Sequence, residues 1–137
     1  MFLGEFQHSL DTKGRVILPI RFRGQLEGGA VMARGLDGFL AVYPPAEFDR
    51  VAAKLQAARE RGANERQAAR SFFSGATECT PDKQGRVAIP ATLRDFAGLG
   101  REVVITGQFD HVEIWDAARW ERQRDAGDEA LAAGRER

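Results

Sequence analysis

The sequence has little cysteine, histidine and proline, and no excess of charge of either sign. Its 137 residues include one cysteine, two histidines and five prolines. The single cysteine, Cys79, excludes an intramolecular disulfide and is typical of a reducing compartment; we expect it to be a small buried apolar side chain. Basic and acidic residues both number 20, so the formal net charge is zero. An acidic partner would therefore have to be recognised through local charge.

Long apolar runs are also missing. No stretch approaches the roughly 20 apolar residues of a membrane-spanning helix, and no basic segment followed by an apolar one opens the chain. His8 and His111 are far apart, and no metal-ligand spacing, nucleophile–histidine pattern or glycine-rich phosphate loop occurs. We therefore expect a soluble cytoplasmic protein that is not an enzyme, with no metal, cofactor, small-molecule substrate or membrane partner.

What the sequence does contain is a repeat. The segment "DTKGRVILPIRF" at residues 11–22 returns as "DKQGRVAIPATL" at residues 82–93. At this offset of 71 the matched pairs are Asp11/Asp82, Gly14/Gly85, Arg15/Arg86, Val16/Val87, Pro19/Pro90 and Arg23/Arg94. Downstream the offset becomes 72, and the matched pairs are Val31/Val103, Gly35/Gly107, Val42/Ile114, Tyr43/Trp115 and Phe48/Trp120. The shared order predicts a tandem duplication.

Each copy predicts the same order of elements. A first strand, around residues 2–8 or 73–79, leads into an Asp-x-x-Gly-Arg turn and a short β-branched strand. Proline then suits the first position of a short helix, and two further strands and a longer helix follow. The longer helices are expected to begin at Pro44-Pro45 and at Asp116, the latter as N-cap.

These elements divide the chain into a first repeat with its helix (1–61), a helical connector (62–72), a second repeat with its helix (73–126) and a flexible tail (127–137). A unit this small buries little apolar area alone, but two units can close a shared barrel that removes unpaired strand edges. We therefore predict a mainly β protein with short helices, of the α+β class. Its two repeats would form a barrel around a pseudo-twofold axis, with flanking helices.

The turn with its following "RVILP" or "RVAIP" strand and short helix resembles the swapped-hairpin barrel of the AbrB-like DNA-binding proteins. Two such copies, in a chain beginning "MFLGEFQHSLDTKGRVILP", resemble the MraZ family over residues 1 to about 125. The resemblance implies a bacterial transcriptional regulator that binds short tandem repeats in the promoter of its own division and cell-wall gene cluster. It further implies a homo-oligomeric ring on double-stranded promoter DNA, associated with the nucleoid.

The resemblance also implies the DNA-facing residues, because the AbrB-like Asp-x-x-x-Arg signature falls on both turns. An arginine fork can pair with guanine or phosphate, whereas lysine supplies a point charge to phosphate. The candidate DNA-binding residues are Arg15, Lys13, Arg86, Lys83, Arg21 and Arg23. The turn-supporting residues are Asp11, Gly14, Asp82 and Gly85. We expect the first turn to contribute more, because Gln84 replaces the counterpart of Lys13.

Other interpretations of these patterns stay open. Each turn arginine could pair with its own aspartate and face water, and Arg21 and Arg23 fit a solvated face as well as a phosphate contact. The basic segment 50–70, with a local charge of +4, fits a solvated or subunit-facing helix. The aromatics Tyr43, Trp115 and Trp120 fit core positions. The alternative function is an oligomeric protein-interaction scaffold or antitoxin-like adaptor, which would bind its partner with less dependence on salt.

Overall fold

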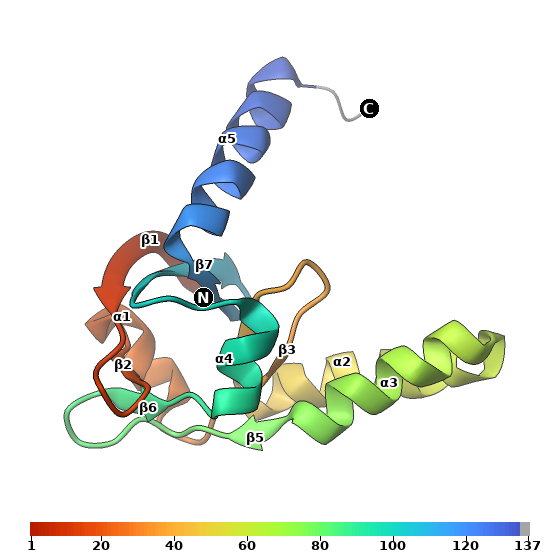
Figure 1. The fold of residues 1–137 in the computed structure, drawn as a ribbon. Coiled ribbons are helices and arrows are strands. Elements are labelled where there is room, and N and C mark those ends of the chain that lie inside the picture. The colour runs from red at the N-terminus through yellow and green to blue at the C-terminus, as the bar shows by residue number, and fades with distance from the viewer. Residues whose placement is uncertain (135–137) are drawn as a thin grey trace.

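The computed structural model describes residues 1–134 and shows a six-stranded sheet, a two-stranded sheet and five α-helices within that range (Figure 1). The strands are β1 (Phe2–Ser9), β2 (Arg15–Ile17), β3 (Val31–Arg34), β4 (Leu40–Tyr43), β5 (Thr77–Glu78), β6 (Arg86–Ala88), β7 (Glu102–Phe109) and β8 (Val112–Asp116). The helices are α1 (Ile20–Arg23), α2 (Pro45–Ala58), α3 (Ala63–Gly75), α4 (Ala91–Ala97) and α5 (Ala117–Ala133), with 3₁₀ turns η1 (Gly24–Leu26) and η2 (Arg59–Arg61). No helix in residues 1–134 is both long and apolar enough to span a bilayer.

The sheet topology shows the duplication directly. The large sheet has the order β1-β7-β8-β4-β3-β5, and β2 pairs with β6 in the small one. The strands β1, β3 and β4 of the first copy correspond to β5, β7 and β8 of the second. Replacing each strand by its counterpart gives the same order read from the other edge of the sheet. Val16 lies opposite Val87, and Ala41 lies opposite Glu113. Because these are equivalent positions of the two copies, a pseudo-twofold axis passes through both sheets, and the predicted tandem-repeat α+β fold is confirmed.

The two copies exchange strands to build one core. β1 of the first copy pairs antiparallel with β7 of the second, and β5 of the second pairs with β3 of the first. Between the sheets lies one buried cluster to which both copies contribute matched side chains: Leu18, Phe22 and Leu26 from the first copy, and Ile89, Leu93 and Ala97 from the second. Cys79 belongs to the same cluster and burial raises the pKa of its thiol to about 12, as expected for an apolar core residue.

A second apolar cluster lies on the other face of the large sheet. Its buried members are Ala33, Phe39, Ala41, Tyr43, Phe72 and Trp115. The helical stripe of α2 (Phe48, Val51 and Leu55) packs on it, as does Trp120 of α5. The core positions predicted for Tyr43 and Trp115 are confirmed, since their exposed fractions are 7% and 4%. Stacking of these two rings on nucleic-acid bases is thereby excluded.

The two copies differ most at their first strands. The strand expected at 73–79 is reduced to Thr77–Glu78, because α3 continues to Gly75. Phe72 and Phe73 explain the difference, since both pack into the second apolar cluster from the end of this helix. The matching segment of the first copy instead forms β1, which is eight residues long. The segment therefore stays helical through Gly75, because the helix lets two adjacent phenylalanines pack into the second apolar cluster.

The C-terminal helix is longer than the sequence pattern suggested. Asp116 caps α5 by accepting a hydrogen bond from the backbone N–H of Arg119, as predicted. The helix then runs to Ala133, through much of the segment 127–137 for which we expected a flexible tail; residues 135–137 lie outside the described range. Alanine has the highest helix propensity, and the alanines of this segment extend the helix without apolar anchors. Figure 1 shows α5 standing away from the rest of the molecule.

Candidate nucleic-acid interface

The first Asp-x-x-Gly-Arg turn is locked by its aspartate. Oδ1 of Asp11 accepts hydrogen bonds from the backbone N–H groups of Lys13 and Arg15, both at 2.9 Å. Oδ2 accepts a hydrogen bond from Nε of Arg15 at 2.8 Å. Gly14 closes the turn at φ +75°, a left-handed conformation that glycine adopts without strain. The carboxylate thus holds both the backbone of the turn and the arginine side chain.

The second turn repeats this geometry. Asp82 accepts hydrogen bonds from the backbone N–H groups of Gln84 and Arg86 at 2.9 Å, and from Nε of Arg86 at 2.9 Å. Gly85 has φ +81°. In both turns the backbone hydrogen bond from the arginine is the largest cause that lowers the pKa of the aspartate, and the arginine side chain adds to it. Both carboxylates therefore remain charged at neutral pH.

The β2–β6 pair brings the two turns together around the pseudo-twofold axis. Ile89 donates its backbone N–H to the carbonyl of Gly14 at 2.9 Å, and Leu18 donates to the carbonyl of Gly85 at 2.8 Å. Val16 and Val87 point into the core. Side chains alternate along a strand, so Arg15 and Arg86 lie on the opposite, outward face of this two-stranded ribbon. The ribbon presents two equivalent arginines to solvent.

Pairing with aspartate engages only part of each arginine's guanidinium. Only Nε of Arg15 and of Arg86 is engaged, and within residues 1–134 the two terminal nitrogens of each guanidinium make no hydrogen bond. Each arginine side chain is 30% exposed. The Asp–Arg pairing left open by the sequence is thus present, and it leaves the tip of each guanidinium able to bind an outside acceptor. The pair orients the fork at little entropic cost.

The remaining predicted DNA-binding residues lie in two different settings. Lys13 and Lys83 are exposed at the turn tips, and Arg21 is exposed on α1. Arg23 is half-buried, and its Nε donates a hydrogen bond to the carbonyl of Leu18 at 2.9 Å. A Cβ built at Gly85 would overlap the guanidinium of Arg23. Arg23 therefore packs against the second turn and supports it. The side chains of Lys13, Lys83 and Arg21 face solvent.

Arg94 is the second-copy counterpart of Arg23 and was not among the predicted site residues. Its Nη1 donates to the carbonyl of Ile89, and its guanidinium lies against Gly14 of the first copy. Each copy thus supplies an arginine that packs against the Asp-x-x-Gly-Arg turn of the other copy. The signal in the sequence was the Arg23/Arg94 match at the offset of 71, but only the strand exchange shows that the match reaches across the copies.

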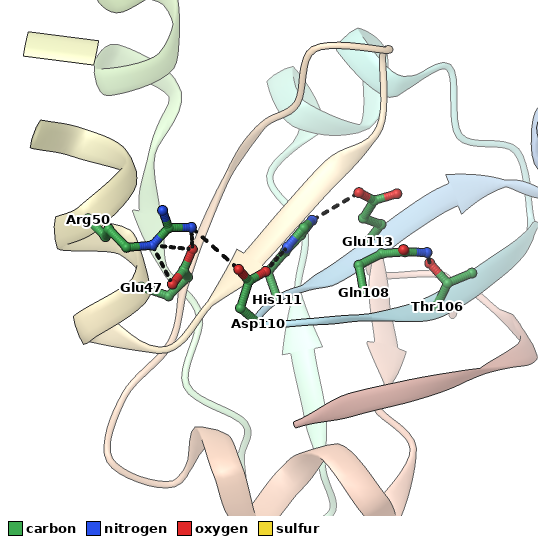
Figure 2. Close-up of polar contacts among 7 residues, drawn as sticks. All are labelled: Glu47, Arg50, Thr106, Gln108, Asp110, His111 and Glu113. Atoms are coloured by element: carbon green, nitrogen blue, oxygen red, sulfur yellow. Dashed lines mark hydrogen bonds and ion pairs between the residues drawn. The ribbon is translucent and has the colours of Figure 1, made fainter. Parts of the chain in front are cut away.

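The polar cluster around His111 is a different kind of site. Figure 2 shows that His111 lies between two carboxylates: its Nδ1 is 2.7 Å from Asp110 and its Nε2 is 2.9 Å from Glu113. Arg50 of α2 pairs with Glu47 and, at 3.4 Å, with Asp110. Trp115 donates its indole N–H to Glu113 at 3.0 Å. The cluster ties α2 to the β7–β8 turn, and among residues 1–134 no group of three histidine, cysteine or acidic side chains is placed to hold a metal ion.

The pKa of His111 follows from these contacts. Burial opposes the imidazolium, but hydrogen bonds and the charges of Glu113 and Asp110 outweigh it and raise the pKa above its ordinary value. The ring also stacks on Phe39 and packs at a tilt against Tyr43. All of these partners belong to the protein itself, so the cluster has a structural explanation.

The fold and the paired turns define a strand-swapped tandem repeat that carries two equivalent arginine turns on one ribbon. A sequence model of the family described as "MraZ protein, putative antitoxin-like" matches the chain twice, at residues 1–71 and 72–137. The chain belongs to the MraZ family.

Curated relatives agree with this assignment. A protein of Halothermothrix orenii is 45% identical over 95% of this chain and 91% of its own length, and one of Desulforamulus reducens is 47% identical over 96% and 95%. A protein of Pediococcus pentosaceus is 50% identical over 88% and 85%. All three carry the name "Transcriptional regulator MraZ". The family is one of transcriptional regulators and not of enzymes.

Proposed function

We propose that this protein is a sequence-specific DNA-binding transcriptional regulator that acts through its two Asp-x-x-Gly-Arg turns. The observation that carries the proposal is the pair of outward arginines. Each is fixed through Nε by its own aspartate, and its two terminal nitrogens make no hydrogen bond to any residue of 1–134. A guanidinium held in this way can form two parallel hydrogen bonds to a guanine edge or to a phosphate. Lys13, Lys83 and Arg21 add positive charge beside the forks and are expected to contact phosphates.

The proposed target is double-stranded promoter DNA upstream of the protein's own gene, in a division and cell-wall gene cluster, with several short repeats in tandem. One ribbon presents only two arginines, so a single subunit has few contacts to offer. A homo-oligomeric ring would place several ribbons on consecutive repeats and raise the avidity. Binding to promoter DNA would associate the protein with the nucleoid.

The test compares wild type with Arg15→Ala by fluorescence anisotropy, on the promoter DNA and on a shuffled control, at two salt concentrations. We expect the wild type to bind the promoter more tightly than the control, and to bind less tightly as salt rises, because phosphate contacts release counterions. Loss of one bidentate base contact costs about 1–3 kcal/mol. Arg15→Ala should therefore weaken promoter binding by roughly 5- to 150-fold for each turn engaged.

Arg122→Ala is the matched control, since it removes an exposed arginine from α5, far along the chain from either turn. It should bind as wild type does. Thermal unfolding of Arg15→Ala should change little, because an exposed ion pair contributes about 0–1 kcal/mol. Promoter binding by Arg15→Ala that equals the wild type would contradict the proposal for the turn.

Two observations favour a second candidate, an oligomeric scaffold or antitoxin-like adaptor that binds protein. The formal net charge of the chain is zero, and the matching family description contains the word "antitoxin-like". Equal and weak binding of both DNAs, together with a salt-insensitive protein partner, would favour this candidate.

A further inference from the structure

An open cavity of about 400 Å³ lies beside the first turn, between the two copies. Its lining residues are Leu10, Asp11, Thr12, Gly14, Arg94, Leu99, Gly100 and Arg101. The first copy supplies the turn, and the second copy supplies α4 and the loop before β7. The cavity adjoins Arg15 through Asp11, whose carboxylate holds Nε of that arginine.

Two arginines of different exposure give the cavity positive charge. Arg94 is half-buried and lies against Gly14, where its bond to the carbonyl of Ile89 fixes the guanidinium. Arg101 lies on the loop before β7, and its side chain is 74% exposed. The cavity therefore has one half-buried, hydrogen-bonded cation and one exposed cation.

The negative charges nearby are already engaged. The oxygens of Asp11 accept two backbone N–H groups and Nε of Arg15. Glu102, which lies 3.5 Å from Arg101, is itself 66% exposed and accepts a hydrogen bond from Ser9. An exposed pair of this kind contributes little free energy, so Arg101 can exchange Glu102 for another anion at low cost.

This arrangement belongs to one side of the molecule only. At the offset of 72 the position equivalent to Arg101 is Gly29, and at the offset of 71 the position equivalent to Thr12 is Lys83. The second turn therefore has an exposed lysine and the half-buried Arg23, but no counterpart of Arg101. The two turns are equivalent in their Asp–Arg locks and different in the charge that surrounds them.

We propose that this cavity is a phosphate-binding site, in which Arg101 contacts a DNA backbone phosphate next to the base contacted by Arg15. The inference rests on the proposed function. Arg94 stabilises the phosphate by its fixed charge, and Thr12 lines the wall that the phosphate would reach. Because phosphate carries no sequence information, Arg101 contributes affinity and register, while Arg15 contributes specificity.

The experiment measures binding of Arg101→Ala to the promoter DNA and the shuffled DNA over a salt series, with wild type and Arg122→Ala alongside. A lost phosphate contact lowers the slope of log affinity against log salt by about 0.9 for each subunit on the DNA. Between 50 and 200 mM salt, the wild type should thus lose about 3.5-fold more affinity per bound subunit than Arg101→Ala. Arg101→Ala should weaken binding to both DNAs by the same factor, and Arg101→Lys should restore the slope.

The outcomes separate this inference from the function on which it rests. If the wild type binds the promoter with strong salt dependence and Arg101→Ala keeps the same affinity and slope, the phosphate site is wrong and the proposed function stands. If Arg101→Ala loses only the preference for the promoter, Arg101 reads bases and the phosphate assignment is wrong. If the wild type binds neither DNA, the proposed function and the inference fail together.

Discussion

At the scale of single residues, each turn depends on an arginine that faces water and one that does not. Arg15 is oriented by Asp11, and its terminal nitrogens make no hydrogen bond in the described part of the chain, whereas Arg23 donates to the carbonyl of Leu18 next to the other turn. The sequence places both arginines among the candidates for DNA contact: Arg15 belongs to the turn signature, and Arg23 follows Pro19 on the short helix, where a solvated face fits as well. Their hydrogen-bond partners separate the two roles. We therefore assign Arg23 to support of the turn and keep Arg15 as the first candidate for recognition.

The glycines of the turns allow a sharp test at this scale. Gly14→Ala puts a side chain at φ +75° and forces it against the guanidinium of Arg94. A non-glycine residue in this backbone region costs about 1–2 kcal/mol, and displacing Arg94 breaks its bond to Ile89. We expect Gly14→Ala to lower the free energy of unfolding by more than 1 kcal/mol, measured by urea denaturation.

Gly24→Ala is the matched control. Gly24 has φ −60° and ψ −36°, and a Cβ built there meets no heavy atom within 4 Å. Alanine at a compatible glycine position stabilises by about 0.4–1 kcal/mol, because it restricts the unfolded chain. Equal effects of the two substitutions would show that the left-handed turn and its contact with Arg94 are not important for stability.

At the scale of elements, the sequence predicted best where local chemistry decides the structure. The Asp-x-x-Gly-Arg turns, the helix that begins at Pro44-Pro45 and the cap at Asp116 all depend on neighbours within a few residues, and all are present. The end of α3 could not be predicted in this way. Phe73 matches Phe2 in the repeat, yet its helix is decided by burial against elements distant in the sequence.

The β7–β8 turn and α2 form a contact that the sequence did not indicate, because His111 and Arg50 are far apart in the chain. His111 has a raised pKa in the folded protein, so the folded state holds its proton more tightly than the unfolded state. The stabilisation is fully present below the ordinary pKa of 6.5 and is lost as pH rises through the folded value. Wild type should therefore be more stable than His111→Gln at about pH 6, and this difference in the free energy of unfolding should shrink by about pH 8.

The measurement is urea denaturation of both proteins at several pH values. His8 provides the control, because burial and the charge of Arg23 lower its pKa. Its contribution has the opposite sign: it is lost as pH falls through the folded value. The wild-type advantage over His8→Gln should thus rise as pH climbs from the lowered folded value to the ordinary 6.5, and should change little above it. An advantage over His111→Gln that stays constant with pH would mean that the imidazolium does not stabilise the contact between α2 and the β7–β8 turn.

At the scale of the whole molecule, the two repeats match in sequence, but neither has all the strands that its sheets require. β1 pairs with β7 and β2 pairs with β6, so both sheets of the first copy need strands of the second. The central core draws Leu18 and Phe22 from one copy, and Ile89 and Leu93 from the other. Dividing the chain would expose this surface on both parts. The repeats are therefore one cooperative unit even though the family model matches each separately.

This argument predicts how two fragments, 1–62 and 63–137, should behave. The break follows Gly62, which lies between η2 and α3, so no α-helix is cut. Neither fragment should unfold cooperatively as a monomer, because each would keep its exchanged strands unpaired. The 1–62 fragment still carries β2 and β4, whose registers are symmetric about Val16/Val87 and Ala41/Glu113. It can therefore regain a core only by pairing with a second copy of itself or with fragment 63–137.

Circular dichroism and sedimentation of each fragment, alone and mixed, test this directly. The mixture should recover a cooperative transition as a one-to-one complex, and any folded state of 1–62 alone should be dimeric and depend on concentration. A folded monomer of 1–62 with a cooperative melt would show that the strand exchange is dispensable. In that case each repeat would be a domain in its own right, and the fixed spacing of the two arginine turns would have to come from some contact other than the β2–β6 ribbon.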